Sequence, residues 1–386
     1  MINTIRQGLL ASIVGMGLFA ANTHAAVALP ATTYSDLVIF GDSLSDTGNV
    51  LSLTTLYGPA PFPSYPGAAG RFSNGPAWTE YLAVGLGFAS SASPSNRFYD
   101  GTNVIPIGAL GGKNYSYGGA RTGLGGSAGP TTGLAGQLVA WDNSTSILTG
   151  NPQLTRAADP NALYVIMAGA NDLRDIRSAN SALDAASVQA RADEATQIAQ
   201  NVAGALGLLA NAGARHFLIS NLPDLGLTPE AATLNRVAAS SDVTVSFNSA
   251  LSSLVGSFEA GFNQVHGVDL DIRTMDFYGL FNEVIDDATN HGGAAFGITN
   301  ATSACINPGF FSGEYFFFDA TSSGCSTAAF SDELHPSARA HELLGALAVQ
   351  TATAPIPEPA EYAMLIAGLL VIGAAARRRA GTKQAA

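Results

Sequence analysis

The sequence predicts one large α/β domain in which helices cover both faces of a parallel sheet. Short apolar runs that read as strands alternate along the chain with segments of helical periodicity. Several of these runs are continuously apolar, which is typical of strands buried on both faces. About 330 residues lie between two distinctive ends, residues 1–25 and 356–386, and this length is enough for one sizeable core.

Strands and helices can be placed in order along the chain. Strands are predicted at residues 37–40, 104–107, 163–168, 216–220 and 268–272. Helices are predicted at residues 78–86, 182–212, 241–262 and 338–349. Residues 50–130 are rich in Gly, Pro, Ser and aromatic residues. We expect this region to be irregular apart from helix 78–86 and to form part of a substrate cleft.

Ser43 follows the first predicted strand, in the stretch Phe40-Gly41-Asp42-Ser43-Leu44-Ser45-Asp46-Thr47-Gly48-Asn49. Open α/β sheets bind ligands at the carboxyl ends of their strands, so this placement suits a nucleophile. A serine hydroxyl is weakly nucleophilic, and it needs a base and hydrogen-bond donors that stabilise the oxyanion. The alternative is a serine that only completes a strand-to-helix turn.

Two further segments offer hydrogen-bond donors. In Asn114-Tyr115-Ser116-Tyr117-Gly118-Gly119-Ala120, a glycine pair can present a backbone N–H without a side chain blocking the approach. Asn171 follows strand 163–168 and can point its side-chain amide into the same crevice as Ser43. A helix N-cap is the alternative interpretation for Asn171 or Asp172.

A candidate base lies near the end of the domain. His335 precedes helix 338–349, and Pro336 suits the first turn of that helix. Asp332 is three residues before His335, close enough on a tight turn for its carboxylate to hold the imidazole tautomer. The other histidines of the domain lack a matching acid in such a setting, and we expect them to be structural or surface residues: His216, His266, His291 and His341.

Taken together, these segments resemble a known family. Residues 40–49, 114–120, 169–172 and 332–335 resemble the four sequence blocks of the GDSL, or SGNH, hydrolases, which are lipases and esterases. Gly70-Arg71-Phe72-Ser73-Asn74-Gly75-Pro76-Ala77-Trp78 resembles the subgroup of bacterial secreted lipases and plant GDSL enzymes. The resemblance covers nearly all of residues 36–350. It implies a flavodoxin-like, three-layer α/β/α sandwich with a parallel central sheet.

The resemblance also implies a catalytic triad. Ser43 would be the nucleophile and His335 the base, with Asp332 orienting His335. The reaction would be hydrolysis of a carboxylic ester through an acyl-enzyme, and it needs no metal and no organic cofactor. An acyl ester or lipid is the expected substrate.

The resemblance further implies three oxyanion donors. These would be the backbone N–H groups of Ser43 and Gly119 and the side-chain amide of Asn171. Gly119 is chosen over Gly118 because of its spacing from Asn114.

Two other functions remain open. One is a carbohydrate O-acetylesterase or an acyltransferase acting on exopolysaccharide, although the aromatic residues of 50–130 favour an acyl chain. The other, from a different class, is a catalytically inactive surface or matrix binding protein. The net charge of −12 argues against a nucleic-acid partner and against docking on anionic lipid.

The two cysteines of the chain are Cys305 and Cys325. In an oxidising compartment they are expected to form one disulfide that closes a loop ahead of His335. Two free buried thiols are the alternative. With no other cysteine and no histidine pair at ligand spacing, a structural zinc site is not expected.

Residues 1–25 read as a secretory signal peptide. Arg6 precedes an apolar run over residues 9–21, and Thr23-His24-Ala25 offers small residues for cleavage after Ala25. A membrane anchor is the alternative, but the run is too short for about 30 Å of hydrocarbon. The domain is therefore expected to cover residues 26–355.

Residues 356–386 resemble a PEP-CTERM sorting tail of Gram-negative bacteria. Ile356-Pro357-Glu358-Pro359 is followed by an apolar segment at 362–376 and by three arginines, Arg377 to Arg379. The resemblance implies transient anchoring in the inner membrane and cleavage by an exosortase, and a simple membrane anchor is the alternative. We expect export across the inner membrane, to the medium, the cell surface or the extracellular matrix.

Overall fold

Four parallel strands form the central sheet of the protein. In the computed structural model they are β1 (Leu37–Gly41), β4 (Leu163–Met167), β5 (His216–Ser220) and β6 (Asp271–Met275). Their order in the sheet is β1-β4-β5-β6, and Leu37 pairs with Leu163, which pairs with His216. Every residue of β1 and β4 is buried. The predicted parallel sheet is confirmed, although β6 (DIRTM) is not an apolar run and the strand predicted at 104–107 lies outside this sheet, in an antiparallel pair.

The structure describes residues 34–65, 68–309, 314–317 and 325–355. All of these residues except Pro355 belong to one compact unit, 32–354. The predicted signal peptide (1–25) and sorting tail (356–386) lie outside the described residues. Within the described part, no helix is both long enough and apolar enough to span a membrane.

An extended segment, residues 113–117, runs beside β1 on the edge away from β4. The backbone N–H of Ile39 donates to the carbonyl of Lys113 at 3.0 Å, and that of Tyr115 donates to the carbonyl of Ile39 at 2.7 Å. The N–H of Tyr117 donates to the carbonyl of Gly41 at 3.2 Å. This pairing brings residues 118–120 to the carboxyl end of β1, next to Ser43.

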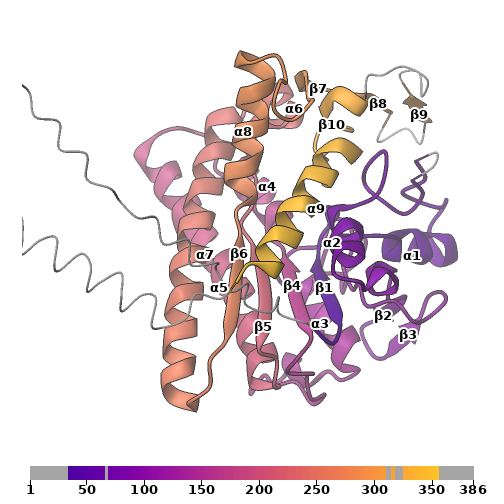
Figure 1. Ribbon diagram of the computed structural model, residues 1–386, viewed down its shortest axis with the longest axis vertical. Coiled ribbons are helices and arrows are strands. Elements are labelled where there is room, and N and C mark those ends of the chain that lie inside the picture. The colour runs from indigo at the N-terminus through magenta and orange to yellow at the C-terminus, as the bar shows by residue number, and fades with distance from the viewer. Residues whose placement is uncertain (1–33, 66–67, 310–313, 318–324, 356–386) are drawn as a thin grey trace, which may run out of the picture. The chain divides into compact units, whose positions relative to one another are not determined.

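Helices pack on both sides of the sheet and complete the predicted three-layer α/β/α sandwich (Figure 1). Helices α5 (Ala185–Asn211) and α7 (Val237–His266) pack against each other in one layer. Helices α2 (Trp78–Gly85) and α9 (Ala338–Thr353) pack against each other in the other, where α9 contacts β6. These four helices match the four predicted ones within a few residues.

The remaining elements are shorter or connect the layers. The other helices are α1 (Asn49–Tyr57), α3 (Leu134–Asp142), α4 (Ala170–Ala179), α6 (Pro229–Thr233) and α8 (Phe277–Asn290). The short 3-10 helices are η1 (Ala89–Ala92), η2 (Ser146–Leu148), η3 (Leu225–Leu227) and η4 (Cys325–Thr327). The other strands are β2 (Arg97–Tyr99), β3 (Val104–Pro106), β7 (Asn300–Ala304), β8 (Ile306–Gly309), β9 (Glu314–Phe317) and β10 (Ala328–Phe330).

The structure corrects the expectation that only helix 78–86 interrupts an irregular region. Helix α1 lies within that region and begins where the Asp46 carboxylate accepts the backbone N–H groups of Gly48, Asn49 and Val50 at 2.8, 2.8 and 3.2 Å. A buried carboxylate can thus cap a helix whose sequence has little helical periodicity.

Besides the unpredicted short elements α6 and β7 to β10, two smaller differences concern the second half of the chain. Helix α8 was not predicted, and it begins at an N-cap, Asp276, whose side chain accepts from the N–H of Gly279. Strand β6 begins at Asp271 rather than at residue 268, because the segment before it continues from the C-cap of α7 at Gly267. Neither difference moves a predicted site residue.

Cys305 and Cys325 form a disulfide, so the alternative of two free thiols is wrong. Both cysteines pack in a small cluster with Tyr65, Ala68 and Ala328. Ala328 is the first residue of β10, the strand that precedes the His335 turn.

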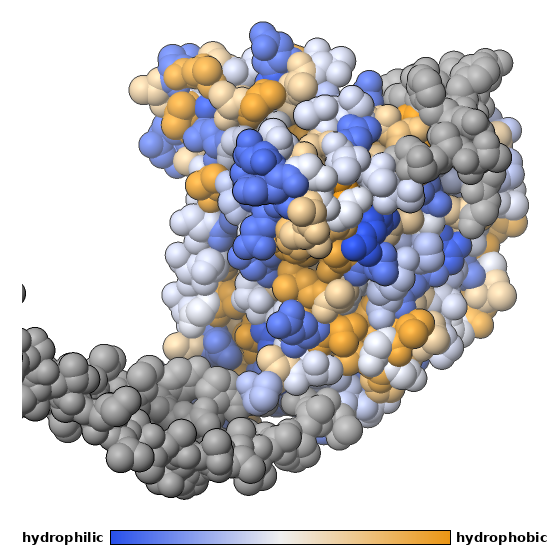
Figure 2. Space-filling view, turned by 45° about the horizontal axis from the view of Figure 1, so that its top comes forward, coloured by the Kyte–Doolittle hydropathy of each residue, from blue (hydrophilic) through white to orange (hydrophobic). Residues whose placement is uncertain are grey.

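The face of the molecule shown in Figure 2 carries hydrophobic patches among hydrophilic residues, as is usual for proteins.

Candidate active site

Ser43 lies on a turn that several buried contacts hold at the carboxyl end of β1. Gln137 of α3 accepts from the N–H of Gly41 at 2.9 Å and donates to its carbonyl at 2.7 Å. A side chain at position 41 would clash with the Met167 carbonyl at 2.6 Å, so glycine is required there. The Asp42 carboxylate accepts from the N–H of Leu44 at 3.0 Å and tightens the turn.

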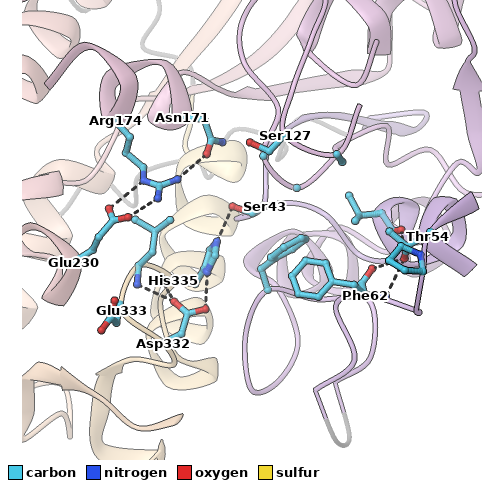
Figure 3. Close-up of a pocket in the computed structure, with 18 residues that line it drawn as sticks. Ser43, Thr54, Phe62, Ser127, Asn171, Arg174, Glu230, Asp332, Glu333 and His335 are labelled. Atoms are coloured by element: carbon cyan, nitrogen blue, oxygen red, sulfur yellow. Dashed lines mark hydrogen bonds and ion pairs between the residues drawn. The ribbon is translucent and has the colours of Figure 1, made fainter. Parts of the chain in front are cut away.

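The structure brings Ser43, His335 and Asp332 together (Figure 3). His335 Nε2 lies 2.9 Å from Ser43 Oγ, and His335 Nδ1 lies 2.7 Å from Asp332 Oδ2. Asp332 Oδ1 accepts the backbone N–H groups of Leu334 and His335 at 2.8 and 2.7 Å, which closes the turn between acid and base. A proton on Ser43 therefore has a direct route to His335.

The surroundings of Asp332 favour its ionised form. Burial acts to raise the pKa of this carboxyl, but the His335 ring and the two backbone N–H groups outweigh it, and the pKa is lowered. The Tyr65 hydroxyl also donates to Asp332 Oδ2, at 2.9 Å. An ionised Asp332 can hold the His335 tautomer and stabilise an imidazolium.

Helix α9 begins after the His335 loop with Ser337 as its N-cap, whose side chain accepts from the N–H of Ala340. Pro336 therefore lies before the cap. The sequence had indicated the first turn of the helix, and that expectation is wrong. The carbonyl of His335 accepts from the N–H of Ser331 at 2.8 Å. The loop is closed at both ends and carries His335 in a fixed position.

Gly118 and Gly119 differ in the use of their N–H groups. The N–H of Gly118 donates to the buried Asp46 carboxylate at 2.9 Å. The N–H groups of Gly119 and Ser43 have no acceptor among the residues that the structure describes. Gly119 has a φ of 75°, and a side chain there would meet Ser127 at 2.7 Å, so glycine is favoured on both counts. Gly119 rather than Gly118 is free to donate to a ligand.

Asn171 lies in the first turn of α4, immediately after β4. The N-cap of α4 is Gly169 and no side chain caps it, so the interpretation of Asn171 or Asp172 as an N-cap is wrong. The Asn171 amide instead donates to the Ala120 carbonyl at 3.0 Å, across to the segment that carries Gly119. Its second N–H remains available, and the residue is largely buried beside Ser43.

A family model covers most of the chain. The model described as GDSL-like Lipase/Acylhydrolase matches residues 37–348. This chain belongs to that family. The family is described as lipases and acylhydrolases, and this chain is accordingly a carboxylic ester hydrolase.

The chain is also similar to individual proteins. The phosphatidylcholine-sterol acyltransferase of Aeromonas hydrophila is 28% identical over 84% of this chain and 79% of its own length. Esterase EstA of Pseudomonas aeruginosa is 27% identical over 90% of this chain and 51% of its own length. A solved carbohydrate acetylesterase, Est24 of Sinorhizobium meliloti, aligns with a TM-score of 0.37 at 14% identity, over 82% of this chain and 98% of that one.

Some residues of the GDSL site were not singled out from the sequence. Tyr65 contacts Asp332, Phe72 packs on the His335 ring at 5.3 Å between centroids, and Arg174 contacts Asn171. Asp46 lies inside the first sequence block, yet its contact with Gly118 depends on the pairing of 113–117 with β1. Among these contacts, the one between Arg174 and Asn171 could have been expected from the sequence, because residues three apart on a helix lie on the same face.

A cavity of about 460 Å³ opens beside Ser43. Its walls differ on the two sides of Ser43 (Figure 3). The side on which Figure 3 labels Phe62 is mainly apolar, because Val50, Phe72 and Ala128, which also line the cavity, pack in one hydrophobic cluster with Phe62. The other side is polar and is lined by Arg174, Glu230 and Glu333. No group of three or more His, Cys, Asp or Glu in the described part of the chain is placed to hold a metal ion.

Three other histidines have environments that the sequence did not indicate. His216 and His291 do have acid partners, Asp271 at 3.1 Å and Asp286 at 3.7 Å, which corrects the expectation. His216 lies at the amino end of β5, away from Ser43, and the His291 pair is exposed at the end of α8. His341 is buried, and its Nδ1 accepts from the N–H of Trp78 at 3.2 Å. Burial lowers the pKa of His341 to about 3, so this ring is a neutral structural acceptor.

Proposed function

We propose that this chain hydrolyses carboxylic esters with Ser43 as nucleophile, His335 as general base and Asp332 as the residue that orients His335. The observation that supports this most directly is the pair of contacts at His335, 2.9 Å to Ser43 Oγ and 2.7 Å to Asp332 Oδ2. Nucleophile, base and orienting acid within hydrogen-bond reach are the arrangement that activates a serine.

The reaction proceeds through an acyl-enzyme. His335 takes the Ser43 proton as the hydroxyl attacks the ester carbonyl, and the protonated ring then gives that proton to the departing alcohol. The N–H groups of Ser43 and Gly119 and the free amide N–H of Asn171 stabilise the tetrahedral oxyanion. Water, activated by His335, then hydrolyses the acyl-enzyme and restores Ser43.

The acyl group of the substrate lies on the apolar side of the cavity. Val50, Phe62 and Phe72 offer hydrocarbon contact there, and burial of each methylene contributes about 0.8 kcal/mol. The alcohol lies toward the polar side. An acyl ester or lipid fits this division better than an acetylated sugar, whose acetyl group would leave most of the apolar side empty.

Ser43→Ala tests the assignment. The variant should fold as the wild type, measured by circular dichroism, and lose activity on p-nitrophenyl esters by at least about 10⁴-fold. A fluorophosphonate probe should label the wild type and not the variant. Full activity in Ser43→Ala would overturn the proposal, and absence of labelling with absence of activity in the wild type would favour the inactive binding protein.

Acyl transfer is a second candidate, because one relative is named as a phosphatidylcholine-sterol acyltransferase. The acyl-enzyme would then react with an alcohol in place of water. Adding a sterol or an exopolysaccharide to the assay separates the two outcomes. Ester products at the expense of free acid would identify a transferase, and unchanged release of acid would identify a hydrolase.

We also propose that the chain is exported through residues 1–25 and processed at residues 356–386. The support is the order of charges and apolar segments at the two ends. Mass spectrometry of the protein from a Gram-negative host with an exosortase should find Ala26 as the first residue and no residues after the Pro-Glu-Pro. A full-length chain in the cytoplasm would contradict this.

A further inference from the structure

Arg174 lies beside the Asn171 amide and, like Asn171, lines the cavity that opens at Ser43 (Figure 3). It is one turn further along α4, and its Nη1 donates to Asn171 Oδ1 at 3.3 Å. It lines the polar side of the cavity, but its guanidinium is directed to Asn171 and Glu230. None of the steps proposed above uses this residue.

Two contacts determine which way the Asn171 amide faces. Its Nδ2 donates to the Ala120 carbonyl at 3.0 Å, and its Oδ1 accepts from Arg174. A reversed amide would place oxygen against the Ala120 carbonyl and an NH₂ group against the guanidinium, and both pairings are repulsive. The observed orientation leaves the second Nδ2 hydrogen for an oxyanion.

Arg174 is itself held in place by a carboxylate. Its Nε donates to Glu230 Oε2 at 3.1 Å, and its Nη2 pairs with Glu230 Oε1. Glu230 also pairs with the buried Arg177, and its backbone N–H donates to the Glu333 carbonyl at 2.8 Å, next to Asp332 in sequence. Through Glu230, the Arg174 guanidinium is therefore linked to Arg177 of the same helix and to the loop that carries His335.

The charges around Glu230 leave a net positive group beside the amide. Burial acts to raise the pKa of Glu230, but Arg174 and Arg177 outweigh it and lower the pKa, so the carboxylate is ionised. Two guanidinium groups then face one carboxylate. A positive charge on the oxygen side of an amide polarises it and makes its N–H a stronger donor.

We propose that Arg174 is a positioning residue of the oxyanion hole: it fixes and polarises the Asn171 amide and acts on the reaction through that amide. The inference rests on the proposed function of Ser43 and Asn171. Loss of an oxyanion donor lowers kcat by about 10² to 10³-fold. Arg174→Met leaves the Asn171 amide in place but held only by its contact with the Ala120 carbonyl. It should therefore lower kcat by a smaller factor, roughly tenfold.

A double-mutant cycle tests the coupling. Arg174→Met, Asn171→Ala and the double variant are compared with the wild type on one p-nitrophenyl ester, with active sites counted by fluorophosphonate labelling. Arg174→Met alone should lower kcat with KM unchanged, and in the Asn171→Ala background it should lower kcat no further. An unchanged kcat in Arg174→Met, an equal loss in both backgrounds, or a loss confined to KM would overturn the proposal.

Arg177→Met is the matched control, because Arg177 shares Glu230 but does not contact Asn171. It should lower the melting temperature and lower kcat per labelled site much less than Arg174→Met does, because it removes one charge of the cluster but not the contact with Asn171. Equal losses of kcat in Arg174→Met and Arg177→Met would assign the effect to the Glu230 cluster and overturn the proposal.

Arg174→Lys keeps the charge and tests the same idea if Arg174→Met does not fold. A lysine can pair with Glu230 but lacks the fork that reaches both Glu230 and Asn171. Its kcat should fall between those of wild type and Asn171→Ala, and a kcat equal to wild type would overturn the proposal. Activity that survives Ser43→Ala would instead overturn the proposed function itself, so the two failures are distinguishable.

Discussion

The turn that carries Ser43 and the turn that carries His335 each contain a buried aspartate, and the two carboxyls have opposite environments. Asp332 accepts backbone N–H groups at Oδ1, and contacts His335 and Tyr65 at Oδ2. Asp42 accepts only from Leu44 at Oδ1, and its Oδ2 has no hydrogen-bond partner among the described residues. The pKa of Asp332 is lowered, whereas burial raises the pKa of Asp42 to about 6.

Because both carboxyls are buried, the opposite directions of their pKa shifts come from their partners, foremost the His335 ring beside Asp332. Both side chains are shielded from water, so both lose hydration. Asp332 recovers that loss from four contacts, and Asp42 does not. We infer that the His335 turn is built to keep a carboxylate ionised, whereas the Ser43 turn uses its aspartate to shape the backbone.

Asp332→Asn should have the largest effect, because it removes the charge from the turn built to hold it. Asparagine can keep the turn but presents the wrong partner to His335 Nδ1, and kcat should fall by about 10⁴-fold. Steady-state kinetics on a p-nitrophenyl ester measure this. A loss smaller than about tenfold would show that Asp332 does not orient the base.

Asn171→Ala tests the donor side of the same site. It should lower kcat by about 10² to 10³-fold, equal to roughly 3 to 4 kcal/mol of barrier, with a much smaller rise in KM. The reverse pattern, a raised KM with kcat retained, would count against an oxyanion role. Asp332→Asn and Asn171→Ala should both leave the melting temperature near that of the wild type.

Asp42→Asn sharpens the contrast through pH. A carboxyl whose pKa is raised by folding destabilises the native state as pH rises from about 4, its unfolded value, to about 6. Asparagine does not titrate, so the free energy of unfolding of the variant minus that of the wild type should increase over this range, by roughly 2 to 3 kcal/mol. Urea unfolding at pH 4.5 and pH 8 measures it, and a difference independent of pH would contradict the raised pKa.

Tyr65→Phe should have the smallest effect, because it removes one of several donors from Asp332. Loss of one of four contacts should raise the barrier by about 1 kcal/mol, which lowers kcat by roughly fivefold, and kcat should fall no further in the Asp332→Asn background. Tyr34→Phe is the control, since the Tyr34 hydroxyl donates to Ala352 and not to the site. Equal kcat losses in both variants would exclude a specific role for Tyr65.

Much of the fold and the principal residues of the candidate site could be predicted from sequence. The strands that carry Ser43 and Asn171 are continuous apolar runs, and parallel strands bring their carboxyl ends to one edge. Asp332 and His335 are three residues apart, so one turn is enough to bring them together. These features depend on local pattern and short spacing, which a sequence displays directly.

Only the tertiary structure decided which groups complete the site. The backbone N–H of Gly118 donates to the Asp46 carboxylate, 72 residues away in sequence, whereas the N–H of Gly119 is left for a ligand. The Tyr65 contact with Asp332 spans 267 residues and depends on the packing around the disulfide. Helix α1 likewise begins at a buried carboxylate and not at a periodic apolar face. Such contacts are set by the docking of whole segments on the sheet, and no local pattern in the chain encodes the distance between their partners.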